Sequence, residues 1–95
     1  MSSHEVTHDA TMTTFSVDLG DAEAVLTYLP VGEDTLDFVE TYVPSEYRGK
    51  GIAAALAGEA FEYARKNGYR VIPSCPYIGT YLKRHPEYQD LVRSS

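Results

Sequence analysis

A glycine-rich, basic segment carries the clearest chemical signal in the sequence. It reads Tyr47-Arg48-Gly49-Lys50-Gly51-Ile52-Ala53 and stands between a predicted strand and a predicted long helix. Glycines at a helix start let backbone N–H groups approach a ligand closely, and the unpaired N–H groups of the first turn, with the helix dipole, attract an anion. Arg48 and Lys50 add positive charge at the same place. The segment predicts a phosphate or diphosphate site; the alternative is a simple glycine turn with its basic side chains in water.

Two common phosphate motifs fit this segment poorly. Gly49, Gly51 and Ala54 match the spacing of the dinucleotide fingerprint, but the next strand is followed by Pro73-Ser74-Cys75-Pro76, without the acidic residue that would hold a ribose. The spacing GxxxxGK[ST] of a P-loop is absent from the sequence. Nicotinamide dinucleotides and nucleoside triphosphates are therefore disfavoured as ligands.

Hydropathy patterns place the segment inside one small α/β domain. Apolar residues recur at helical spacing from about residue 50 to Asn67, where Gly68 ends the helix. Three strands are predicted before it, over residues 15–19, 22–28 and 35–43, as an antiparallel meander. A strand over 69–72 and a helix from Pro76 to His85 follow. The two strands that flank the long helix should then be parallel, with a right-handed crossover.

The ends and the composition bound the class of protein. Residues 1–12 are polar and lack periodicity, so we expect a disordered tail before a single domain over 13–95. His4 and His8 lie in that tail without a third ligand, and no metal site is predicted. Cys75 is the single cysteine, which excludes an intramolecular disulfide, and no apolar run approaches the about 20 residues that cross a bilayer. We expect a cytoplasmic protein that does not associate with membranes.

Charge is divided unevenly along the chain. Residues 1–47 contain ten acidic residues and no Lys or Arg, whereas residues 48–95 contain eight basic and four acidic ones. The formal net charge of −6 argues against binding to nucleic acid. The basic half suits a small polyanion, and the acidic half suits a cationic partner or serves only solubility.

Several segments together resemble the GNAT superfamily of N-acetyltransferases, in its compact single-domain form. Arg48-x-x-Gly51-x-Ala53 resembles the acyl-CoA signature [QR]-x-x-G-x-[GA] of that superfamily. The run from Thr41-Tyr42-Val43-Pro44 to Ala53, then Ile72-Pro73-x-Cys75-Pro76-Tyr77 and His85-Pro86-Glu87-Tyr88, is similar to the compact members over about residues 13–92. The resemblance implies a minimal GNAT-like α/β (α+β) fold, with a mostly antiparallel sheet and a β-α-β-α C-terminal half. It also implies that acetyl-CoA binds with its diphosphate on residues 48–53 and its pantetheine arm along Thr41, Tyr42 and Val43.

The catalytic candidates are Glu40, Cys75 and Tyr81. Glu40 and Asp37 are the strand carboxylates nearest the expected thioester, and their three-residue separation predicts that they face opposite sides of the sheet. Compact GNAT proteins often carry histidine where Glu40 stands. Cys75 precedes a predicted helix, a setting that lowers the pKa of a thiol, and the resemblance places it in the active-site cavity. Tyr81 matches the region in which many GNAT proteins keep a tyrosine acid for the leaving thiolate. Each also has a plain structural interpretation: a hydrated carboxylate, a buried small side chain and a core tyrosine.

These observations predict an N-acetyltransferase that uses acetyl-CoA by direct attack of an amine. The acceptor is left open between a small amine and a lysine-bearing peptide, and a monomer or weak dimer is expected. The alternative is a non-catalytic module that binds coenzyme A for sensing or for contact with a partner protein.

Overall fold

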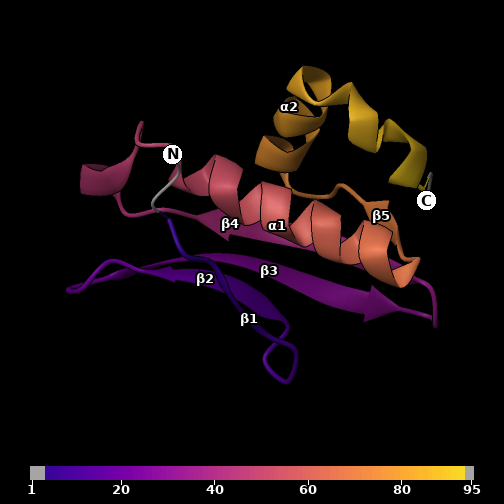
Figure 1. Cartoon of the computed structure of the whole chain (residues 1–95), viewed down its shortest axis with the longest axis horizontal. Helices are drawn as coiled ribbons and strands as arrows, with labels where there is room; N and C mark the ends of the chain where they lie inside the picture. Colours follow the sequence, from indigo (N-terminus) through magenta and orange to yellow (C-terminus); the bar gives the residue numbers. More distant parts are fainter. Residues whose placement is uncertain (1–3, 94–95) are drawn as a thin grey trace.

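A computed structural model of the chain describes residues 4–93. Its elements in chain order are β1 (Thr7–Asp9), β2 (Thr14–Asp18), β3 (Glu23–Val31), β4 (Thr35–Tyr42), the 3-10 turn η1 (Ser45–Tyr47), α1 (Ile52–Asn67), β5 (Arg70–Ile72), α2 (Pro76–Arg84) and the 3-10 segment η2 (Pro86–Leu91). Figure 1 shows α1 lying along the sheet, with α2 on the same side of the sheet as α1. Within residues 4–93, no helix combines the length and the apolar character needed to cross a bilayer.

The sheet has five strands in the order β1-β2-β3-β4-β5. Neighbouring strands from β1 to β4 are antiparallel, and β5 pairs parallel with β4. This confirms the mixed, mostly antiparallel α/β fold, the three-strand meander and the parallel pair that flanks the long helix. The sheet positions β4, the last strand of the meander, between β3 and β5.

Strand β1 corrects the expectation of a disordered tail over residues 1–12. Within the described part of that tail, Thr7–Asp9 pair with β2, with His8 opposite Phe15. The imidazole of His8 stacks on the ring of Phe15 at 4.1 Å between centroids, and its Nε2 shares a hydrogen bond of 2.7 Å with the Tyr28 hydroxyl. Burial lowers the pKa of His8 and so favours the neutral ring that packs there. The sequence pattern missed this strand because one histidine, and no apolar alternation, anchors it.

Helix α1 begins at Ile52, two residues later than predicted. Its N-cap residue Gly51 has φ +82°, a left-handed conformation that cannot continue into the helix. The buried side of α1 includes Phe61, whose ring packs edge-on against Phe38 of β4 at 5.2 Å between centroids. The ring of Tyr88 in η2 stacks on Phe61 at 4.9 Å between centroids. The aromatic cluster therefore joins sheet, helix and C-terminal segment in one core.

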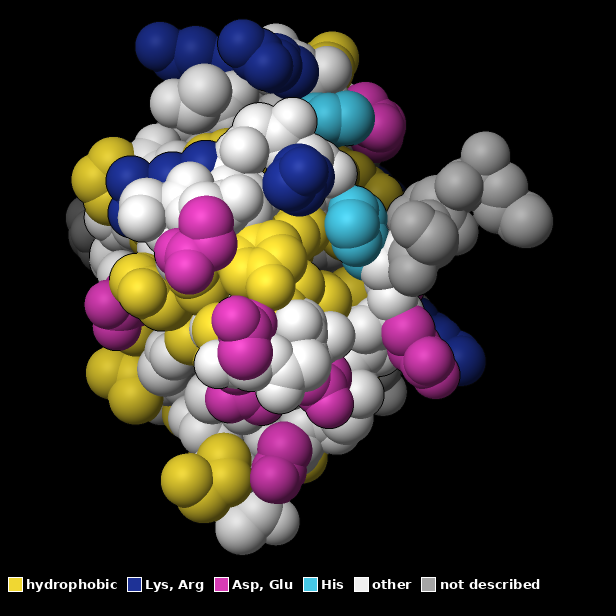
Figure 2. All heavy atoms as spheres, turned by 90° about the vertical axis from the view of Figure 1, so that its left-hand side faces the viewer, with side chains coloured by type: hydrophobic (Ala, Val, Ile, Leu, Met, Phe, Trp, Pro, Cys, Tyr) yellow, Lys and Arg dark blue, Asp and Glu magenta, His cyan; other side chains and the backbone are white. Residues whose placement is uncertain are grey.

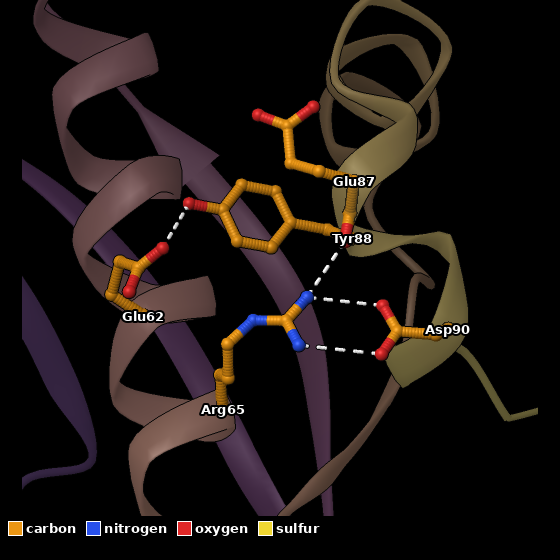
Figure 3. Close-up of polar contacts among 5 residues, drawn as sticks. All are labelled: Glu62, Arg65, Glu87, Tyr88 and Asp90. Atoms are coloured by element: carbon orange, nitrogen blue, oxygen red, sulfur yellow. Dashed lines mark hydrogen bonds and ion pairs between the residues drawn. The ribbon is translucent and has the colours of Figure 1, made fainter.

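Polar contacts fasten η2 to the exposed side of α1 (Figure 3). The Tyr88 hydroxyl donates to Glu62 Oε2 at 2.5 Å. Arg65 donates to the carbonyl of Glu87 at 2.7 Å and to both carboxylate oxygens of Asp90 at 3.0 and 3.3 Å. A bidentate guanidinium–carboxylate pair fixes orientation as well as distance. These contacts hold η2, and with it the end of α2, against α1.

Candidate active site

Strand β4 carries a β-bulge and then loses its partner on one side. Tyr28 of β3 faces Phe38, and the preceding Thr27 faces Glu40, so that Val39 is the extra residue of β4. On the other side, β5 pairs with β4 only as far as Asp37, and the amide of Cys75 then donates to the carbonyl of Phe38 at 2.9 Å. Beyond Phe38, no strand of the described chain pairs with that side of β4. The C-terminal half of β4 therefore presents an open backbone edge.

The start of α1 presents a second set of unpaired backbone groups. The first amide bonded in helical fashion is that of Ala55, which donates to the carbonyl of Gly51 at 3.0 Å. The amides of residues 49–54 donate to no acceptor in the part of the chain that the structure describes. Gly49 and Gly51 both have φ +82°, and this turns the loop so that it leads into the helix. Unbonded N–H groups at the positive end of a helix dipole form an anion site.

Arg48 connects these two features. Its Nε donates to the carbonyl of Val43 at 3.0 Å, just beyond the end of β4. This bond ties the loop to the open strand edge. Arg48 and Lys50 are both exposed, so their positive charges remain accessible to a ligand.

The open edge and the loop border one groove of about 540 Å³. Its walls are the end of β4 (Thr41, Tyr42 and Val43), the loop and the first residues of α1, and two side chains of α2, Tyr77 and Arg84. Figure 2, which views this end of the molecule, shows hydrophobic side chains in the middle, Lys and Arg mostly above them and Asp and Glu mostly below. The acidic and basic residues, which are unevenly distributed along the sequence, are thus also largely separated in space.

The structure brings most of the predicted cofactor-binding residues to this groove. Eight of the nine predicted residues line it: Thr41, Tyr42, Val43, Arg48, Gly49, Gly51, Ile52 and Ala53. Lys50 does not line it, and its carbonyl oxygen lies 2.9 Å from Nε2 of His4. The other residues that line the groove were not among the predicted cofactor-binding residues: Tyr47, Ala54, Tyr77 and Arg84. The spacing of Tyr77 and Arg84, seven residues apart on a predicted helix, is the signal that they share one face.

The three predicted catalytic residues do not line the groove. Cys75 is 5% exposed, and its Sγ donates a weak hydrogen bond to Oγ1 of Thr41 at 3.5 Å, so it lies directly behind the groove wall. Tyr81 is 7% exposed and stacks between Phe61 and His85 in the core. Tyr77 borders the groove instead, and burial raises the pKa of its phenol. Within residues 4–93, no three His, Cys, Asp or Glu side chains are placed to hold a metal ion.

The predicted orientation of the two strand carboxylates is wrong. Asp37 is paired with Leu29 and Glu40 with Thr27, and these two partners are two residues apart on β3 and so share a face. The bulge at Val39 shifts the alternation by one residue, which brings Glu40 to the side that Asp37 occupies. Both carboxylates therefore point away from the helices.

Comparison with known proteins defines the class to which this fold and groove belong. Residues 14–91 match the family model of the GCN5-related N-acetyl-transferases. The chain belongs to that family.

Individual relatives have the same compact size. Protein NATD1 of Xenopus tropicalis is 39% identical over 94 residues, which cover 97% of this chain and 86% of that protein. Protein NATD1 of Mus musculus is 39% identical over 90 residues, or 93% of this chain and 82% of the relative. The solution structure of a GCN5-like protein from Staphylococcus aureus superposes with a TM-score of 0.75 at 28% identity, covering 100% of this chain and 93% of the other.

Proposed function

We propose that this protein binds acetyl-CoA in the groove and transfers the acetyl group directly to a primary amine. One observation carries the proposal: the unbonded amides of residues 49–54 and the open edge of β4 border the same groove. An anionic group and an amide-bearing chain are what these two surfaces accept. Coenzyme A has both in one molecule, and its acetyl thioester supplies the activated acyl group.

The residues of the groove fit the parts of this ligand. The amides of residues 49–54 and the α1 dipole suit the diphosphate, with Arg48 nearby. Arg84 and Lys50 add positive charge for the ribose phosphate. The edge of β4 over Thr41–Val43 suits the two amides of a pantetheine arm, which pairs there as an added strand would.

Proton transfers are assigned to side chains near the open edge. Glu40 is exposed beside that edge and takes the proton of the attacking ammonium, directly or through water. An unpaired backbone N–H of β4 stabilises the charge that develops on the acetyl oxygen. We assign the proton donor for the departing thiolate to Tyr77, in place of Tyr81, because Tyr77 borders the groove and its raised pKa keeps the phenol protonated.

The second candidate function is a binding module that holds coenzyme A without turnover. It is favoured by the position of Glu40, Cys75 and Tyr81, none of which lines the groove. In that case the groove would sense acyl-CoA or contact a partner protein. The two functions differ in whether bound acetyl-CoA is consumed.

Release of free coenzyme A in the presence of an amine panel tests the proposal. We expect release with at least one small amine or lysine peptide, and none with the Gly51→Glu protein, whose added carboxylate repels the diphosphate. Gly32→Glu is the matched control, since Gly32 also has a positive φ with open space around it and lies in the β3–β4 turn. Binding of acetyl-CoA without release across the panel would support the binding module instead.

A further inference from the structure

Within residues 4–93, the helices α1 and α2 lie on one face of the sheet and none lies on the other (Figure 1). Pairing assigns each side chain of β1–β4 to a face, because directly paired residues share one. Leu26, Phe38 and their neighbours on the helix-covered face are buried. The alternate side chains point away from the helices, and we call them the outward face. They include the pairs Asp18–Glu23, Val25–Tyr42 and Leu29–Asp37.

The outward face exposes large apolar side chains. Four large hydrophobic residues are exposed in the described structure, and three of them lie on this face: Leu29 at 53%, Tyr42 at 48% and Val31 at 37%. A water-facing sheet side normally carries polar residues. Leu29 and Val31 are two residues apart on β3, whereas Tyr42 pairs with Val25 toward the other end of the face. Exposed apolar side chains with polar neighbours are typical of surfaces that bind another molecule.

Carboxylates surround these apolar side chains. The acidic residues of the outward face are Asp9, Asp18, Glu23, Asp37 and Glu40. Strands β1–β4 contain no Lys or Arg. Two arginines bring positive charge to the end of the face far from Tyr42: Arg70 of β5 pairs with Thr35, and Arg93 of the C-terminal segment bonds the Thr35 hydroxyl. The field over the remainder of the face is therefore negative.

Asp37 adds an independent observation. Its Oδ1 is buried and accepts no hydrogen bond within the described chain. Native proteins seldom leave a buried carboxylate oxygen without a donor. Asp37 is also the last β4 residue that pairs with β5, so this unsatisfied acceptor lies where the two strands separate.

The dimensions favour a polypeptide over a small amine. Strand β3 has nine residues, so the face is about 30 Å long and, across four strands, about 14 Å wide. A small polyamine would cover part of this area and leave the apolar side chains in water. The area is below the about 800 Å² per partner of a stable interface, which suits a transient substrate complex.

The outward face also leads to the groove. Glu40 lies on the outward face, and the next residue, Thr41, lines the groove on the other side of the same strand. Since no strand covers that edge of β4, a side chain laid over the face has a short path around it. We propose that the outward face docks a lysine-bearing polypeptide segment with apolar residues between its lysines, and that this segment is the acetyl acceptor. The role of this segment as acetyl acceptor rests on the proposed acetyl transfer, whereas the docking surface does not.

Equilibrium binding, measured without acetyl-CoA, tests the docking surface. The probe is a fluorescein-labelled peptide that alternates lysine and valine, followed by fluorescence anisotropy. We expect Asp18→Asn/Glu23→Gln to weaken binding about threefold to tenfold, the loss typical of two rim charges. Glu59→Gln/Glu87→Gln removes the same charge from exposed positions on α1 and η2 and should leave affinity unchanged. In turnover assays the first pair should raise KM for the peptide and leave KM for acetyl-CoA and kcat unchanged.

Several results would overturn the docking surface. One is the absence of any peptide binding, and another is equal weakening of peptide binding by both variant pairs. Displacement of the peptide by spermidine at equal concentration, or a homodimer that Asp18→Asn/Glu23→Gln dissociates, would also contradict the proposal. Face-specific binding of a peptide that is never acetylated would support the surface and overturn the proposed transferase activity. Turnover of the peptide that Asp18→Asn/Glu23→Gln does not change would support the transferase activity and overturn the docking surface.

Discussion

At the scale of single residues, the proposed anion site depends on the backbone conformation of Gly51. Its φ of +82° turns the chain so that the amides of the loop and of the first helical turn stay free of acceptors. A Cβ at this position would meet no atom within 4 Å, so any cost of substitution comes from the backbone conformation.

We expect Gly51→Ala to lower the free energy of unfolding by about 1 kcal/mol and to weaken binding of coenzyme A. Urea unfolding and titration calorimetry measure the two effects. Gly79→Ala is the control: it lies within α2, has no positive φ and also has open space, so it should be neutral or stabilising. Equal behaviour of the two variants would contradict a conformational role for Gly51.

Cys75 distinguishes direct transfer from a covalent intermediate. It is buried behind Thr41, so its thiol should react with a disulfide reagent much more slowly than free cysteine. We expect Cys75→Ala to retain turnover, because in the proposed mechanism the amine attacks the thioester directly. Accumulation of acetylated Cys75 in mass spectra, with loss of turnover in Cys75→Ala, would contradict direct attack.

The sequence predicts which loop residues border the groove, but it does not predict the orientation of the carboxylates of Asp37 and Glu40. The types and spacing of Arg48, Gly49 and Gly51 predict an anion site because the cause is local. The common face of Asp37 and Glu40 depends on the bulge at Val39, which exists only in the pairing of β4 with β3. The position of Tyr81 in the core likewise depends on how α2 packs on Phe61.

At the scale of elements, β4 serves two purposes along its length. Its first part is held between β3 and β5, and its second part is paired on one side only. The rigid part fixes the position of the open part, and Arg48 joins the open part to the start of α1. A site built this way needs α1 and α2 to stay fixed relative to the sheet, which is the role of the contacts of η2.

Tyr88→Phe removes the hydrogen bond to Glu62 and so tests whether this contact holds η2 against α1. The pH dependence of the effect on stability is the critical observation. Near neutral pH we expect the substitution to lower the free energy of unfolding by about 1 kcal/mol, the contribution of one hydrogen bond. Burial and the Glu62 carboxylate raise the pKa of Tyr88 above its ordinary value of about 10. Above pH about 10 the unfolded phenol ionises while the folded one stays protonated, so the advantage of the wild type should shrink as the pH rises. Urea unfolding of both proteins across this range measures the difference, and a difference independent of pH would contradict the assignment.

Elements with a strong internal pattern were predictable, and short ones were not. The periodicity of α1 and the alternation of β2 identify them in the sequence. Strand β1 has three residues and is held by the ring of His8 between Phe15 and Tyr28, contacts that require the finished sheet. Its contribution to the sheet edge could not be seen in a polar, aperiodic segment.

At the scale of the whole molecule, most basic side chains at the groove end lie on one side of the hydrophobic middle and most acidic ones on the other (Figure 2). An anionic ligand is attracted to the groove while the acidic sheet is turned away from it. Acetyl-CoA at about 100 times its Kd should stabilise the fold by about 2.7 kcal/mol, which for a chain of this size raises Tm by roughly 10–20 °C. Nicotinamide dinucleotide should give no comparable rise in a thermal unfolding scan, and an equal rise would contradict the preference for coenzyme A.

The central claim is that the free amides at the start of α1 bind the diphosphate of coenzyme A. Titration of the ¹⁵N-labelled protein with coenzyme A tests it most directly. The largest amide shifts should occur in residues 49–54, with smaller ones along Thr41–Val43. Saturable binding with shifts concentrated elsewhere, and with the amides of residues 49–54 unmoved, would contradict it.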